Sequence, residues 1–168
     1  MKALIVLLIL TLNLTAQTNI GVEIDPTMIT KEKGLDFTVV ITDDQPILGY
    51  DFRIGVILEM YGKRHYYGAG VTLDYPIEYG YAFASIGVEL GLIVRDKVPL
   101  PYAPGETTFQ KYRTHGLNAN LGFWITNDLA VTARLNYKRR GDLDRWAVKG
   151  DDYRHSVYIG FKYKIKTK

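Results

Sequence analysis

The sequence predicts an all-β fold: an eight-stranded antiparallel up-and-down transmembrane β-barrel that follows a cleaved signal peptide. Three observations lead to this class. Residues 1–16 have the pattern of an export signal, and the rest of the chain alternates apolar and polar residues with a period of two. Tight turns also alternate with long connections along the chain.

Composition bounds the class further. The chain has 168 residues, of which 47% are apolar and 12% aromatic, and these values fit one folded domain and exclude a disordered chain. It contains no cysteine, which excludes a zinc–thiolate site and a cysteine nucleophile. The formal net charge of +3 is small and unclustered, so we expect no nucleic-acid partner.

The N-terminal segment predicts export through a Sec-type signal peptide. Met1 and Lys2 precede an apolar run that ends at Leu10 and continues weakly through residues 11–14, and the small pair Thr15 and Ala16 follows. We expect cleavage after Ala16, which leaves residues 17–168 as the barrel domain. A permanent N-terminal anchor is the alternative, but the apolar run is shorter than the roughly 20 residues of a spanning helix.

Eight segments show the strand pattern. In residues 129–138 the odd positions are apolar, and the even positions after Ala130 are polar. The same alternation predicts strands at residues 19–29, 34–42, 47–61, 65–77, 81–95, 113–126, 129–140 and 153–166.

The connections predict which end of the barrel is which. Short turns are expected at residues 43–46, 78–80 and 127–128, and long loops at residues 97–112 and 141–152. With an even number of up-and-down strands, both termini fall on the short-turn side. Short periplasmic turns and longer outer loops are typical of bacterial outer-membrane barrels.

These features resemble the small eight-stranded outer-membrane β-barrels of Gram-negative bacteria, the group typified by the OmpA transmembrane domain and OmpX. The resemblance covers the whole mature chain and implies a place in the cell outer membrane, among lipid and lipopolysaccharide. Family members commonly end on an aromatic residue, whereas this chain continues past Tyr163 into the lysine-rich tail up to Lys168.

Period two alone does not decide which face looks outward. A soluble exported lipocalin-like barrel, with an apolar ligand inside, has the same alternation. The polar face here is rich in glycine, such as Gly68, Gly70 and Gly122, which suits a narrow interior better than a soluble surface. Aromatic residues such as Tyr61 and Tyr137 lie near strand ends, as in interfacial girdles. We therefore favour the membrane barrel.

If the polar face is internal, many charges point into one narrow lumen. Isolated buried charges cost several kcal/mol each, so they must pair. We predict an interior ion-pair network centred on Arg53 and Arg134 that plugs the lumen, with a gated ion path as the alternative. Its predicted members are Asp51, Arg53, Glu59, Asp74, Glu89, Arg134 and Lys138, and Glu23, Asp36 and Lys162 share their face.

Basic residues and all three histidines fall at the outer strand ends. We predict that this rim faces lipopolysaccharide phosphates. Its members are Lys63, Arg64, His65, Arg113, His115, Arg139, Arg140, Arg154 and His155. A rim-sited lipid A-modifying enzyme is an alternative, but His155 and Ser156 are adjacent and would point to opposite faces of a strand. We expect no enzyme, no cofactor and no metal site.

The two long loops are the candidate recognition surfaces. Tyr102 in the first and Trp146 in the second are aromatic residues in proline-containing or exposed loops, which favour binding of a protein partner. The alternative is that the hairpins simply extend and pack on themselves. No feature of the sequence requires an oligomer, so we favour a monomer.

Overall fold

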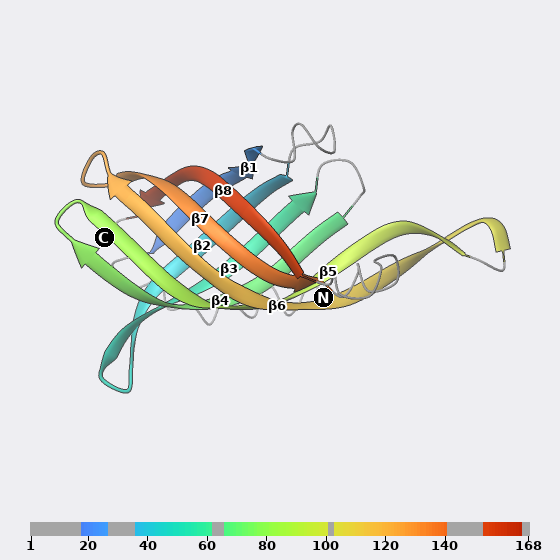
Figure 1. The fold of residues 1–168 in the computed structure, drawn as a ribbon, viewed down its shortest axis with the longest axis horizontal. Helices are drawn as coiled ribbons and strands as arrows, with labels where there is room; N and C mark the ends of the chain where they lie inside the picture. Colours follow the sequence, from blue (N-terminus) through green and yellow to red (C-terminus); the bar gives the residue numbers. More distant parts are fainter. Residues whose placement is uncertain (1–17, 27–35, 62–65, 101–102, 141–152, 166–168) are drawn as a thin grey trace.

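The computed structural model describes residues 18–26, 36–61, 66–100, 103–140 and 153–165. Its strands form one closed barrel in sequence order, and β1 pairs with β8 to close it (Figure 1). The strands are β1 Asn19–Asp25, β2 Asp36–Ile47, β3 Tyr50–Tyr61, β4 Tyr66–Tyr79, β5 Ala82–Leu100, β6 Ala103–Trp124, β7 Leu129–Arg140 and β8 Tyr153–Lys164. The predicted barrel fold is confirmed.

The structure does not test the predicted signal peptide. The predicted signal peptide, residues 1–16, lies outside the described residues, so the cleavage site and the domain boundary stay predictions. In the described part of the chain, no helix has the length and apolar character needed to cross a membrane.

The register explains why one face is apolar and the other polar. On β6 and β7, Leu117 pairs with Tyr137 and Leu121 with Ala133, while Asn120 pairs with Arg134 on the other face. Because side chains alternate along a strand, the two side chains of each such pair share a face, with these apolar pairs outward and this polar pair inward.

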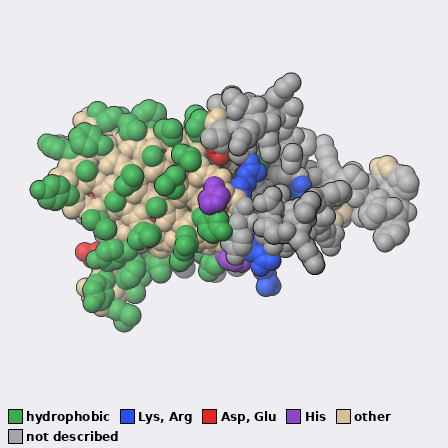
Figure 2. Space-filling model, viewed as in Figure 1, with side chains coloured by type: hydrophobic (Ala, Val, Ile, Leu, Met, Phe, Trp, Pro, Cys, Tyr) green, Lys and Arg blue, Asp and Glu red, His purple; other side chains and the backbone are tan. Residues whose placement is uncertain are grey.

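The outer surface of the barrel body is apolar. Figure 2 shows hydrophobic side chains spread over its visible face, with histidine and basic side chains where this surface ends. Its exposed members include Val22, Leu58, Met60, Val71, Leu73, Ile86, Val88, Leu90, Leu117, Leu121, Phe123, Leu135, Val157, Ile159 and Phe161. A soluble monomer rarely exposes a patch of this extent. The lipocalin-like alternative needs the opposite arrangement, with apolar side chains inside.

One predicted turn is wrong. The turn expected at residues 43–46 is strand, because β2 continues to Ile47 and Pro46 pairs with Asp51 of β3. The reversal occurs at Leu48 and Gly49, whose φ angles are 52° and 81°. Positive φ at both central residues is the requirement of a type I′ hairpin turn. Proline is tolerated here because the hairpin end is a sheet edge.

The first predicted long loop is also wrong. Most of residues 97–112 are strand, since β5 reaches Leu100 and β6 begins at Ala103. Pairing continues to the tip, with irregularities between Arg95 and Val98 and between Pro99 and Leu100. The two strands project from the barrel as a long ribbon (Figure 1). The alternative of an extended hairpin is therefore confirmed for this connection, while residues 141–152 lie outside the described part.

Candidate functional site: the lumen and the outer rim

An ion-pair network crosses the lumen. Arg134 of β7 donates from Nε to Glu23 Oε2 of β1 at 2.7 Å. Lys138 of β7 donates to both carboxylate oxygens of Glu59 on β3, at 2.8 and 2.9 Å. Glu89 of β5 pairs with Lys138, and its Oε2 lies 3.6 Å from Arg134 Nη1. These five residues, the central network, are between 1% and 5% exposed.

Neutral groups add hydrogen bonds to the central network. Tyr61 Oη donates to Glu59 Oε2 at 2.8 Å, and Asn136 Nδ2 donates to Glu89 Oε2 at 2.6 Å. The Arg134 guanidinium also lies over the Tyr158 ring, 4.5 Å from its centroid. The network has three carboxylates for two cations, so these neutral donors stabilise carboxylate charge that the cations alone leave in excess.

The structure brings four of the predicted interior residues together in this network: Glu59, Glu89, Arg134 and Lys138. Sequence reasoning placed Glu23 on the polar face but left it out of the predicted network. Glu23 and Arg134 are 111 residues apart in the chain and meet because β1 and β7 lie on either side of β8.

Arg53 belongs to a second cluster, at the short-turn end. Its Nε lies 2.6 Å from Asp44 Oδ1, and its Nη2 lies 3.0 Å from Asp44 Oδ2 and 3.1 Å from Glu78 Oε1. The prediction of a single network centred on Arg53 and Arg134 is therefore wrong. Sequence reasoning missed Asp44 and Glu78 because it assigned both residues to turns.

Of the predicted interior residues Asp51 and Asp74, only Asp74 faces the lumen. Asp51 is exposed, so its predicted place inside the lumen is wrong. The physical reason is that β3 pairs with β4 only from Arg53 onward, and Asp51 lies on the part of the hairpin that leaves the barrel wall. Asp74 faces the lumen, where Thr72 Oγ1 lies 3.5 Å from its Oδ2.

An aromatic cluster fills the short-turn end of the lumen. Phe83, Trp124 and Ala130 are buried together, and the two rings lie 5.4 Å apart between centroids. Lys162 Nζ is 5.0 Å from the Phe83 ring centroid, within range of a cation–π contact. Gly122, in register with Phe83, makes room for this ring, since a Cβ there would clash with Phe83 Cζ. Sequence reasoning missed this cluster, although an aromatic residue on the glycine-rich face was the available signal.

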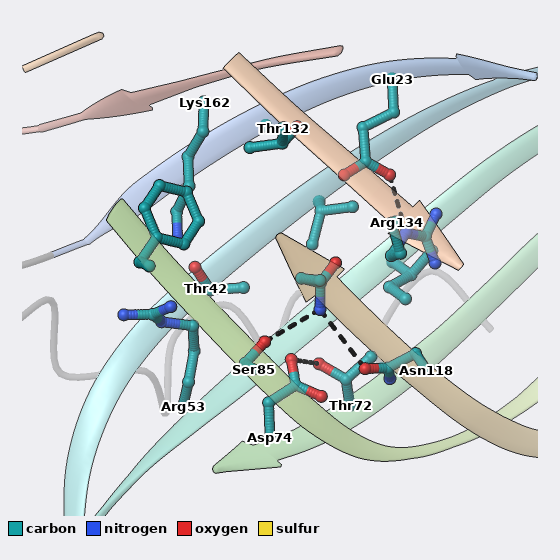
Figure 3. A pocket seen from close by; sticks show the side chains of 15 residues that line it. Glu23, Thr42, Arg53, Thr72, Asp74, Ser85, Asn118, Thr132, Arg134 and Lys162 are labelled. Atoms are coloured by element: carbon teal, nitrogen blue, oxygen red, sulfur yellow. Dashed lines mark hydrogen bonds and ion pairs between the residues drawn. The ribbon is translucent and has the colours of Figure 1, made fainter. Parts of the chain in front are cut away.

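A small cavity of about 40 Å³ lies inside the lumen, and Figure 3 shows its lining. It includes buried polar atoms that have no hydrogen-bond partner in the described part of the protein: Asp74 Oδ1, Asn118 Nδ2, Thr132 Oγ1 and Arg134 Nη2. Such a polar space suits a few water molecules and is too small for an organic ligand.

The rim residues that the structure describes lie at the long-hairpin end. His115 pairs in register with Arg139, and both His115 and Arg113 are exposed on the outer face. His155 is exposed as well, and its ring lies 4.6 Å from that of Tyr137. The parity of β8 turns Arg154 toward the lumen side instead, where it is partly buried, so its predicted place on the outward rim is wrong.

The other predicted site residues lie wholly or partly outside the described residues. Lys63, Arg64, His65, Tyr102 and Trp146 lie outside the described residues. Arg140 closes β7, and its backbone alone is described. Within the described ranges, no cluster of three or more His, Asp or Glu side chains has the arrangement of a metal site.

Comparison with known proteins gives structural neighbours only. No protein-family model and no curated protein matches the chain. The crystal structure of Neisserial surface protein A (NspA) matches with a TM-score of 0.54 and 16% identity, over 89% of this chain and 95% of that one. The Yersinia pestis outer membrane protein Ail, solved in a phospholipid bilayer nanodisc, matches with a TM-score of 0.54 and 10% identity, over 90% of this chain and 100% of that one. The chain therefore has the eight-stranded barrel fold of the small, OmpX-like outer-membrane proteins.

Proposed function

We propose that the chain is a non-enzymatic, monomeric outer-membrane protein, a structural and binding scaffold with a plugged interior. The observation that carries this proposal is the distribution of side chains, which is the reverse of that in a soluble barrel: ion pairs lie inside, and the exposed outer face is apolar. A barrel stable in water would expose the charges and bury the apolar side chains. In a bilayer, the same outer face contacts lipid and needs no further cover.

The outward residues of single strands support the bilayer assignment. Along β8, the outward positions from Tyr163 to Val157 are aromatic or aliphatic, and His155 follows them. Along β7, Arg139 follows the apolar positions that end at Tyr137. A strand needs about 9–11 residues to cross the hydrocarbon core at a tilt, and β7 and β8 have 12 residues each.

Two closures support a plugged lumen rather than an open solute pore. The central network spans the barrel between four strands, and the aromatic cluster of Phe83, Trp124 and Ala130 fills the short-turn end. An eight-stranded barrel is only wide enough for side chains to fill.

The rim supports contact with lipopolysaccharide, and the projecting ribbon supports recognition. Arg113, His115, Arg139 and His155 are cationic or imidazole groups at the outer end of the apolar band, where lipid phosphates would lie. The ribbon of β5 and β6 extends beyond the barrel, as expected for a surface that reaches a protein partner. The contribution of Tyr102 and Trp146 to this recognition stays a prediction.

Envelope fractionation tests the proposal. We expect the native protein in the outer-membrane fraction of a density gradient, with a fast gel band that slows after boiling. The fast band reports a folded barrel that resists detergent, and boiling unfolds it. Recovery as a soluble periplasmic or secreted protein would contradict the proposal.

A further inference from the structure

A groove crosses β5, β6 and β7 on the outer face of the barrel. It has a volume of about 390 Å³, and its lining includes Val88, Leu90, His115, Leu117 and Tyr137. The register assembles this lining, since Val88 pairs with Leu117, Leu90 with His115, and Leu117 with Tyr137. The remaining lining residue with a long side chain, Glu89, is 1% exposed and turns its carboxylate to Lys138 in the lumen. The groove therefore presents apolar walls and one imidazole to the outside.

The groove lies where the apolar band of the barrel meets the basic rim. Apolar side chains continue toward the short-turn end, with Ile86 on β5 and Leu121 on β6. Toward the long-hairpin end, His115 is level with Arg139, and Arg113 is the next outward residue on β6. Figure 2 shows the same boundary, where histidine and basic side chains succeed the hydrophobic surface. The groove is thus apolar at one end and cationic at the other.

The described charged side chains on the outer face around the groove are basic. Among the described side chains of β5 to β8, the one strand carboxylate is that of Glu89, which faces the lumen. Among the side chains that the structure describes on this face, those nearest to an anion at His115 and Arg139 are therefore positive or imidazole groups. Arginine can bind phosphate through two parallel hydrogen bonds, and phosphate is an anion that lipid headgroups carry at this level of a bilayer.

We propose that this groove is a specific site for lipid A, the phosphorylated glycolipid of lipopolysaccharide. One acyl chain lies along Leu117, Leu90 and Val88, and a phosphate contacts His115 and Arg139. The inference rests on the proposed function, because that function places the long-hairpin end in the outer leaflet. The proposed function gives the rim a general attraction for lipid phosphates. The inference adds a defined binding position for one lipid A molecule.

A titration in nanodiscs tests this site. The full chain is folded in phosphatidylcholine nanodiscs and titrated with bisphosphorylated lipid A, and backbone amide resonances are followed. We expect saturable shifts at Leu90, His115 and Leu117, and binding about tenfold weaker for dephosphorylated lipid A. Inorganic phosphate alone should shift none of these resonances at the same concentration.

Variants separate the groove from the general surface. Leu90→Trp should fill the groove and His115→Ala should remove a phosphate contact, each weakening binding by about tenfold. Ile86→Trp is the matched control, since Ile86 lies on the same strand and face and is 61% exposed against 59% for Leu90. The control should bind lipid A as the parent does.

Four results from a folded chain would overturn the inference: no saturable binding of lipid A, equal binding by Leu90→Trp and Ile86→Trp, shifts spread evenly around the barrel, or an equal response to phosphatidylglycerol. The last would assign the groove to anionic phospholipids in general. Failure of the proposed function would look different, because the parent chain would then not enter the bilayer and would give no heat-sensitive gel band. A folded chain without saturable lipid A binding contradicts the inference alone.

Discussion

Lys138 is bound by two carboxylates at once, Glu59 on β3 and Glu89 on β5, inside a barrel with little room for water. A buried charge that loses its partner keeps the full cost of its removal from water, whereas a complete pair recovers most of it. The stability of the central network therefore depends on its completeness. Each cation serves two carboxylates, so the loss of one cation affects both.

Replacement of Lys138 measures how far the stability of the barrel depends on a complete central network. We expect Lys138→Met to lower the free energy of unfolding by about 3–5 kcal/mol, because Glu59 and Glu89 stay buried without their main cation. Urea unfolding in lipid vesicles, followed by gel mobility, gives the value. Lys164→Met is the control: Lys164 is only partly buried, over the Trp124 ring, and its loss should cost less than about 1 kcal/mol. Equal losses in the two variants would show that the central network does not stabilise the barrel more than an ordinary surface contact.

The contact between Gly122 and the Phe83 ring is a second residue-scale dependence. We expect Gly122→Ala to lower the free energy of unfolding by about 1–3 kcal/mol, since the new Cβ overpacks the aromatic cluster. Gly21→Ala is the matched control, because a Cβ there would meet ordinary contacts of 3.6 Å and more. The double variant Gly122→Ala/Phe83→Leu should recover part of the loss. The same urea titration compares the three, and a Gly122→Ala barrel as stable as Gly21→Ala would refute the contact.

Sequence parity predicted correctly that Glu59, Glu89, Arg134 and Lys138 face inward, because period two is a local property of a strand. It could not predict which of them meet. Partners across a lumen depend on the stagger between strands, and stagger is a property of the closed barrel. Arg53 illustrates the limit: its face was predicted, but its partners Asp44 and Glu78 come from hairpin ends whose extent the pattern missed.

At the scale of elements, the strands were predictable and their ends were not. The pattern in residues 129–140 matches β7 as observed, since neither its alternation nor its boundaries depend on distant residues. The turn after β2 was misplaced because Asp43, Asp44 and Pro46 favour turns in general, while the hairpin ladder overrides that preference. The ribbon of β5 and β6 was missed because two strands that pair only with each other lack a strong alternating pattern.

The outer face of β7 gives an element-scale prediction. Leu135→Arg should cost roughly 2–4 kcal/mol of folding free energy in a bilayer and reduce insertion, because it places a charge on the lipid face. Leu129→Arg, at the turn end of the same face, should cost about 0–1 kcal/mol. Folding yield into vesicles, read as the heat-sensitive gel band, compares the two variants. A Leu135→Arg barrel that folds as well as Leu129→Arg would place this face outside the hydrocarbon core.

For the whole molecule, the lumen has two closures in series, so conductance requires both to open. The central network closes the middle, and the cluster of Phe83, Trp124 and Ala130 closes the short-turn end. We expect no large stable conductance in planar bilayer recordings of the parent chain, and none from Phe83→Ala or Arg134→Ala alone. Each single variant leaves one closure that excludes ions.

The double variant Phe83→Ala/Arg134→Ala should show measurable ion flux, because it shortens a side chain in each closure, on β5 and on β7. The heat-sensitive gel band serves as the folding control, so that leakage through unfolded protein is not counted. A large stable conductance from the folded parent would contradict the plugged lumen and favour a gated path through the charged residues. A conductance that appears with Phe83→Ala alone would instead show that the aromatic cluster is the barrier and that the central network passes ions. Two closures in series therefore predict that the conductance of the double variant exceeds the sum of the conductances of the two single variants. If the lumen had one closure, one of the single variants would already conduct.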